Sequence, residues 1–238
     1  MLDVAEDAPS GLGVLMNLPS LGGAAGQTPM RRPLLMTTAM VATTLAGLKT
    51  ETRRLMSPQP DWLKGEVMSW KGAIGLVDQM ASPYGRPGDL LWLKEDWRVE
   101  DGSVARGRLR IGYRDGSSRW VDVPCAEVLE RLAADLAQAP AGAARWRRAR
   151  FMFGWASRAL LEVVEVRAER LQDITFAGAV AEGLQAAGKG WQATPDAPWH
   201  ANPVHAYRWL WDAIHGPGAW DANPYVWVVG FDVAKVER

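Results

Sequence analysis

A short segment near residue 50 concentrates reactive side chains. The run is Gly47-Leu48-Lys49-Thr50-Glu51-Thr52-Arg53-Arg54. It follows an apolar helical pattern from Met40 to Ala46, and Gly47 stands where a helix commonly ends in a left-handed residue. Loops that are held by rigid elements carry function more often than the elements themselves do. The run therefore predicts a functional site directly after a helix.

The residue types in this run suit nucleophilic catalysis. A threonine hydroxyl is a weak nucleophile until a base removes its proton, and a buried lysine loses enough basicity to act as that base near neutral pH. Lys49 and Thr52 are three residues apart, so in a regular strand they would point to opposite faces. They converge only if Lys49 lies in the turn or the strand is bulged, and Gly47 favours the turn.

Each of these residues also has an ordinary structural interpretation. Lys49 is then a solvated lysine after a helix, Thr52 a plain strand residue, and Glu182 a surface carboxylate near a helix end. Arg53 and Arg54 either grip a phosphate or carboxylate of a ligand or form a structural ion pair. The acidic partners that we considered for such a pair are Asp89, Glu95 and Asp96.

The run has the Gly-x-Lys-Thr-x-Thr-Arg pattern and resembles the signature of ASCH domains, small β-barrels of the PUA-like superfamily. The resemblance covers about residues 32–233, with an insertion near the middle, and its ending is similar to a phage and prophage branch of the family. It continues through the segments 86–97, 155–158, 160–166, 169–174, 181–183, 210–212 and 220–228.

The resemblance implies an α+β fold, a small mixed PUA-like β-barrel with flanking helices and an inserted hairpin–helix segment at about residues 99–150. In the ASCH enzymes that deacetylate 4-acetylcytidine, a motif lysine and threonine act with a later glutamate. By that resemblance Lys49 would be the base, Thr52 the nucleophile, and Glu182 a proton donor or orienting group. The predicted function is a nucleobase or nucleoside pocket with amidohydrolase activity toward acylated cytidine-type substrates.

Two other functions stay open. The first is a non-catalytic reader of RNA or modified nucleic acid, or a ribonuclease, of phage or prophage origin. The second is a phage accessory or assembly protein with a relic pocket, which a solvent-blocked Lys49 would favour. For ligand contacts we expect Trp97 as a stacking wall and Arg108, Arg110, Arg147 and Arg148 along a nucleic-acid backbone, although such clusters are more often a solvated face.

Composition limits these functions. The chain has 238 residues, 27 basic and 27 acidic, so no global field attracts a polyanion and any such binding needs a local patch. The single cysteine, Cys125, excludes an internal disulfide and fits a reducing cytoplasm. The three histidines lack zinc-site spacing, no cofactor is expected, and no apolar run reaches the length of a membrane span.

The elements that must position the site follow from local patterns. Residues 1–29 have no steady period and are predicted to be a disordered extension, or to follow a start codon assigned too early, whereas 30–238 form the domain. We expect a helix capped by Thr37 or Thr38, a hairpin around Asp115-Gly116, and a long loop at 185–201. The other expected helices are 125–138, 175–182 and 202–214, the last of which opens with Asn202 as its cap and Pro203 in its first turn and carries Tyr207 on its apolar side. The other expected strands are 49–55, 70–77, 90–97, 160–166 and 225–233.

Overall fold

The structure is a computed structural model that describes residues 28–60, 82–139 and 144–237. In this part of the chain, helices and mixed sheets combine in an α+β fold, as predicted. The extension predicted for residues 1–29 lies outside the described residues up to position 27, and the strand expected at 70–77 lies wholly outside them.

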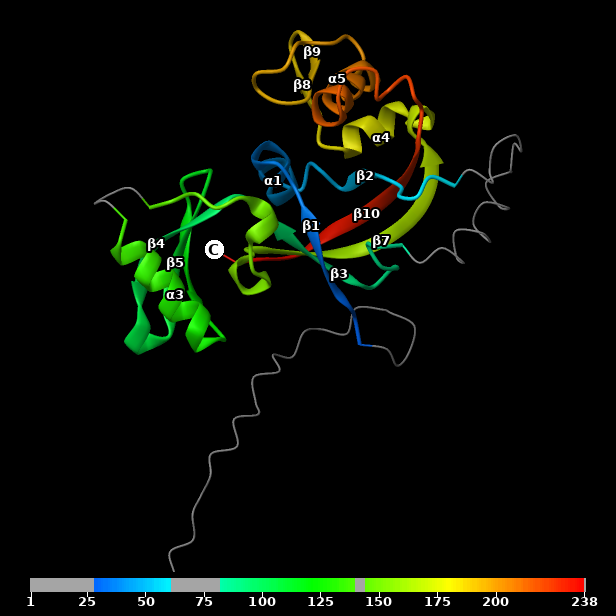
Figure 1. The fold of residues 1–238 in the computed structure, drawn as a ribbon. Helices are drawn as coiled ribbons and strands as arrows, with labels where there is room; N and C mark the ends of the chain where they lie inside the picture. Colours follow the sequence, from blue (N-terminus) through cyan, green and yellow to red (C-terminus); the bar gives the residue numbers. More distant parts are fainter. Residues whose placement is uncertain (1–27, 61–81, 140–143, 238) are drawn as a thin grey trace, which may run out of the picture.

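A five-stranded sheet forms the centre of the molecule, in the order β1-β3-β7-β10-β2. Its strands are β1 (Arg31–Leu35), β2 (Glu51–Leu55), β3 (Leu90–Lys94), β7 (Ala159–Arg170) and β10 (Tyr225–Val236). β1 pairs with β3 in parallel, and the other neighbours are antiparallel. The long strands β7 and β10 curve across the molecule, and α1 (Thr38–Leu45) connects the two end strands, β1 and β2 (Figure 1).

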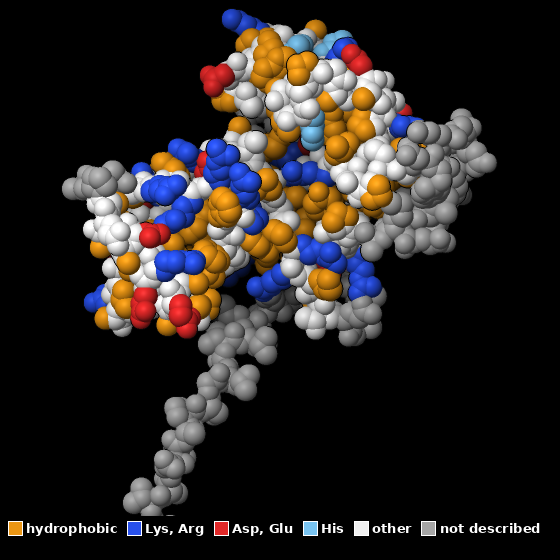
Figure 2. Space-filling view, viewed as in Figure 1, with side chains coloured by type: hydrophobic (Ala, Val, Ile, Leu, Met, Phe, Trp, Pro, Cys, Tyr) orange, Lys and Arg blue, Asp and Glu red, His pale blue; other side chains and the backbone are white. Residues whose placement is uncertain are grey.

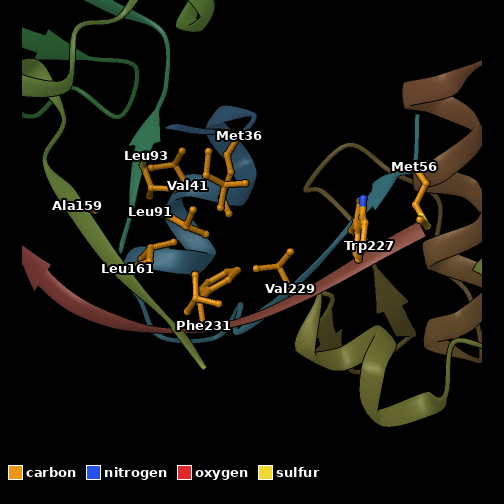
Figure 3. Close-up of a cluster of buried hydrophobic side chains, with 12 residues drawn as sticks. Met36, Val41, Met56, Leu91, Leu93, Ala159, Leu161, Trp227, Val229 and Phe231 are labelled. Carbon is orange, nitrogen blue, oxygen red and sulfur yellow. The ribbon is translucent and has the colours of Figure 1, made fainter. Parts of the chain in front are cut away.

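Both faces of the sheet are covered, and β10 contributes to each. Alternate side chains of a strand point to opposite faces, so Trp227, Val229 and Phe231 pack with α1 in one cluster while Val226 and Val228 pack in another. Figure 3 shows the first cluster, where side chains of α1 meet those of β3, β7 and β10. The second lies under α4 (Phe176–Ala181) and α5 (Pro203–His215).

Local capping chemistry sets the helix starts, and the predicted caps at Thr37 and Asn202 are confirmed. The Thr37 hydroxyl accepts a hydrogen bond from the Met40 N–H, and Thr175 does the same for Gly178 at the start of α4. Asn202 caps α5, whose first residue is Pro203.

The loop expected at residues 185–201 contains two short strands, so that expectation is wrong. β8 (Gln185–Ala187) and β9 (Gly190–Gln192) form a hairpin, and Trp191 bridges to His200. Gly190 has φ +123°, and a Cβ there would lie 2.3 Å from the His200 carbonyl oxygen. Gly190 is therefore what lets two backbones approach closely in this hairpin.

A second unit lies beside the sheet (Figure 1). It contains β4 (Trp97–Ser103), β5 (Arg108–Tyr113), β6 (Ser118–Asp122) and α3 (Ala126–Ala137), around its own apolar core. The predicted hairpin and helix of this segment are confirmed. Short 3-10 turns occur at Val104–Arg106, Ala149–Phe151, Gly154–Ala156 and Leu171–Asp173.

A buried ion pair fastens this unit to the sheet. The guanidinium of Arg158, just before β7, makes two 2.7 Å hydrogen bonds to the carboxylate of Glu95, and a third of 2.7 Å to Asp115 in the β5–β6 turn. Burial raises the pKa of Glu95, and Arg158 opposes that shift. In the described part of the chain, no helix is both long and apolar enough to cross a bilayer.

Candidate functional site

The turn before β2 places Lys49 as the sequence argument requires. β2 begins at Glu51, so Lys49 lies in the turn and not in the strand. Gly47 has φ +72°, and the N–H groups of Leu48 and Lys49 donate to the Thr43 carbonyl at 2.9 and 3.1 Å. The Thr50 N–H then donates to a carbonyl at the end of α4 at 2.9 Å. These bonds bring the turn against the segment that carries the predicted glutamate.

Lys49 and Glu182 form a buried ion pair. Nζ of Lys49 lies 2.5 Å from Oε2 of Glu182 and also donates to the carbonyl oxygens of Glu51 and Glu182, each at 2.9 Å. All three N–H donors of the ammonium therefore have acceptors, and the Lys49 side chain is 0% exposed. Removal from water lowers the pKa of Lys49, while the Glu182 carboxylate partly opposes that shift.

The second oxygen of Glu182 is held as firmly as the first. Oε1 accepts from the backbone N–H of Arg53 at 2.6 Å and from the hydroxyl of Tyr207 at 3.2 Å. Burial, reinforced by the Glu182 charge, raises the pKa of Tyr207 well above its usual value, so this hydroxyl stays a donor. Sequence reasoning placed Tyr207 on the apolar side of its helix and missed its part in the site.

Arg53 belongs to a network of carboxylates. Its guanidinium lies 2.8 Å from Glu51, 3.3 Å from Glu169 and 3.5 Å from Glu182. Arg167 bridges Glu51 and Glu169 from the other side, at 2.6 and 2.5 Å. Of the two interpretations of Arg53, the structural ion pair is therefore the one observed. Its partners differ from the expected acids because β2, β7 and β10 are neighbours in the sheet.

A cavity of about 430 Å³ opens beside this pair. Its walls come from the β1–α1 connection, from β2, from α5 and from the place where the second unit meets the sheet. Thr52 and Glu182 both line it, whereas Lys49 lies behind Glu182 and outside the lining. The structure thus places Thr52 and Glu182 on the cavity wall, and Lys49 reaches this region through its contact with Glu182.

The polar wall of the cavity on β2 consists of Thr52, Arg53 and Arg54, of which Arg53 is already engaged by carboxylates. Thr52 is 2% exposed, and its hydroxyl makes no hydrogen bond to any described residue. Arg54 donates to the carbonyl of Leu35, and no described carboxylate lies within ion-pair distance of it. The hydroxyl and the guanidinium are therefore the groups on this wall with capacity left for a ligand.

The aromatic wall is not the one expected. Trp97 is 1% exposed in the core of the second unit, packed edge-on against Phe153 and Trp155, and it does not line the cavity. This placement corrects the prediction of a Trp97 stacking wall. The cavity has instead Trp211 of α5, whose ring lies 4.1 Å from that of His215. The four-residue spacing of these two residues on one helix face was the available signal.

Most of the predicted nucleic-acid contacts have acidic partners. Arg108 pairs with Asp122 at 2.9 Å, and Arg110 lies 3.7 Å from Glu100, both on the β5 hairpin. Arg147 pairs with Asp135 at 2.9 Å. Arg148 is exposed and directly precedes Ala149, which lines the cavity. Three of the four arginines are thus engaged by acidic side chains, and Arg148 is the one that adjoins the cavity.

Comparison of the chain with protein-family models, curated proteins and solved structures gave no match. The resemblance to ASCH domains therefore stays a prediction that rests on the motif residues. Within the described ranges, no group of three or more His, Cys, Asp or Glu side chains is arranged to hold a metal ion.

Gly183 is predicted to be essential to the geometry of the ion pair. It has φ +90°, and a Cβ there would lie 2.8 Å from both the Lys49 Cβ and the Thr43 hydroxyl. Gly47 is a matched control, since its φ is +72° but a Cβ would meet nothing within 4 Å. We expect Gly47→Ala to lower the free energy of unfolding by about 1 kcal/mol and Gly183→Ala by about 2–4 kcal/mol. Urea denaturation measures both, and equal losses would contradict the crowding argument.

Proposed function

We propose that this chain binds a nucleobase or nucleoside in the cavity and hydrolyses an amide on an acylated exocyclic amine of the cytidine type. The observation that carries the proposal is the shared wall of Thr52 and Glu182, with the Lys49 amine held against Glu182 at 2.5 Å. The cavity volume falls within the range of about 300–1,000 Å³ that small-molecule pockets occupy. We further propose that the curved sheet corresponds to a PUA-like barrel.

Thr52 is the nucleophile in this proposal. Its hydroxyl gives its proton to the uncharged Nζ of Lys49, which Glu182 orients, while the oxygen bonds to the acyl carbon. The C–N bond then breaks, Lys49 returns the proton to the departing amine, and an ester remains on Thr52. Water hydrolyses that ester and releases the carboxylic acid, which restores the hydroxyl.

Glu182 orients Lys49 in this scheme. Of the two roles predicted for Glu182, proton donor and orienting group, the second is supported by its environment. Both of its oxygens accept hydrogen bonds, from Lys49, from the Arg53 N–H and from Tyr207. These hydrogen bonds hold the carboxylate in one position. Glu182 thereby fixes the position of the amine, and Lys49 is the member of the pair whose pKa burial lowers.

Acetate release from 4-acetylcytidine by the purified protein tests the proposal, and its pH dependence tests the base. Only the uncharged form of Lys49 accepts a proton, and its pKa lies below the usual value because of burial. We therefore expect kcat/KM to rise with pH and to reach its plateau at a lower pH than an exposed lysine would give. Acetyl-lysine, which has the acetyl amide but no nucleobase, is the control substrate. Absence of release from every acylated nucleoside would refute the enzyme proposal.

The complete burial of Lys49 also supports the alternative of a phage accessory protein with a relic pocket, because a blocked amine is what that alternative requires. Calorimetric titration with cytidine and 4-acetylcytidine separates the possibilities. A relic pocket binds neither nucleoside, a non-catalytic reader binds without turnover, and the proposed enzyme binds and releases acetate.

A further inference from the structure

Residues 144–151, here called the rim segment, lie at the edge of the cavity. Ala149 lines the cavity, and its N–H donates to the Asp96 carboxylate at 3.0 Å. The carbonyl of Arg150 accepts a hydrogen bond of 2.6 Å from Lys94, at the end of β3. The segment is therefore attached to the cavity wall at Ala149 and to the end of β3 at Arg150.

The rim segment is also held rigidly. Arg147 and Trp97 exchange two backbone hydrogen bonds, of 3.1 and 2.7 Å. Two guanidinium groups pack on the ring of Trp146, and those of Arg98 and Arg114 lie 4.8 and 4.1 Å from its centre. A ligand that binds here meets a preformed surface, which reduces the entropy lost on binding.

The positive charges on the rim segment and its neighbours are unevenly compensated by carboxylates. Arg98, Arg114 and Arg147 each have a carboxylate partner, namely Glu100, Asp96 and Asp135. Four other cations have no described carboxylate within 4.0 Å: Lys94, Arg145, Arg148 and Arg150. Since the chain as a whole carries no net charge, this is a local excess. Figure 2 shows Lys and Arg side chains gathered beside the hollow where the second unit meets the sheet.

An exposed aromatic ring completes the surface. Phe151 is 63% exposed, the largest exposed fraction among the large hydrophobic residues described, and the guanidinium of Arg150 lies 5.2 Å from its ring centre. A solvated basic face has no need of an exposed phenyl ring. An aromatic ring among cations is the combination that stacks a base while neutralising phosphates.

We propose that the rim segment binds the sugar–phosphate backbone of single-stranded nucleic acid, so that one unstacked nucleotide enters the cavity. The proposal builds on the proposed function, because it takes the cavity as a base site, and it makes the substrate a base within a polynucleotide. A single strand fits because a base must leave its stack to enter a pocket. A lipid surface fits less well, since interfacial binding uses an amphipathic apolar face and the rim segment exposes one phenyl ring.

Binding of a fluorescent single-stranded RNA of about 12 nucleotides, within the usual site sizes, tests the proposal by anisotropy at several salt concentrations. The variant Arg148→Ala with Arg150→Ala removes two rim cations, and Arg108→Ala with Arg110→Ala removes the same charge from the β5 hairpin. Log affinity falls with log salt, and each lost phosphate contact makes this slope shallower by about 0.7. We therefore expect the slope of the rim variant to be shallower than that of the natural chain by about 1.4. Phe151→Ala is expected to weaken binding about tenfold.

The control pair should leave affinity and slope nearly unchanged. No binding of the RNA by the natural chain, equal losses in the two arginine pairs, or preference for a duplex of the same sequence would overturn the proposal. Acetate release from free 4-acetylcytidine, measured on the same preparations, reports separately on the cavity. If the rim variant loses RNA binding and the control pair keeps it, while neither the natural chain nor any variant releases acetate, the rim inference stands and the enzyme proposal fails.

Discussion

Replacing Thr52 with valine is expected to abolish acetate release, with kcat/KM falling by at least about 10⁴-fold, as loss of a catalytic nucleophile does in other covalent hydrolases. Valine keeps the branched shape of threonine at this 2% exposed position. The hydroxyl makes no hydrogen bond to a described residue, so its removal leaves no described group without a partner. The free energy of unfolding should therefore change little.

Thr52→Ser is the matched variant, because it keeps the hydroxyl and removes only a methyl group. We expect it to retain measurable turnover, and we expect the valine variant to bind cytidine as the natural chain does. Steady-state kinetics and calorimetry supply the readouts. A valine variant with undiminished turnover would remove Thr52 as the nucleophile, whereas equal inactivity of both variants would point to packing at this position.

Replacing Lys49 with methionine is expected to cost about 3–5 kcal/mol of unfolding free energy, the usual range when one member of a buried ion pair is removed. The reason is the carboxylate that remains. Glu182 is buried and loses its closest cation, although the Arg53 N–H and Tyr207 still donate to it. The carbonyls of Glu51 and Glu182 also lose their donor.

The second variant, Lys49→Met with Glu182→Gln, removes both charges and keeps an amide able to meet Arg53 and Tyr207. We expect it to recover part of the stability lost in the single variant, since no uncompensated charge remains. Neither variant should release acetate. Denaturant titration of the natural chain, of Lys49→Met alone, of Glu182→Gln alone and of the double variant completes a double-mutant cycle. Strictly additive losses would contradict the ion pair as the source of the cost.

Several elements are predictable because their cause is local. Thr37, Asn202-Pro203 and Asp115-Gly116 act through backbone groups within a few residues, and the structure has the expected caps and hairpin at all three. The position of Lys49 in a turn also follows from neighbours, since Gly47 ends the helix and β2 starts at Glu51.

Strand β1 shows where local reasoning fails. The segment Arg31–Leu35 carries two arginines and Pro33, which argue against a strand. It is nevertheless a strand because it stands at the end of the sheet order, where a missing N–H is tolerated, and because β3 offers a parallel partner. That partner lies about sixty residues away, beyond any local pattern.

The sequence by itself determined the α+β class and the main helices, because residue type and near spacing carry that information. The candidate set Lys49, Thr52 and Glu182 was implied by the resemblance to ASCH domains and not by spacing, since Glu182 lies 133 residues beyond Lys49. The tertiary structure decided which groups surround them. It committed Arg53 to Glu51 and Glu169, buried Trp97 in a separate core, and made Trp211 the aromatic wall. Ion pairs and cavity walls join segments more than a hundred residues apart, and their partners exist only once the sheet has placed those segments side by side.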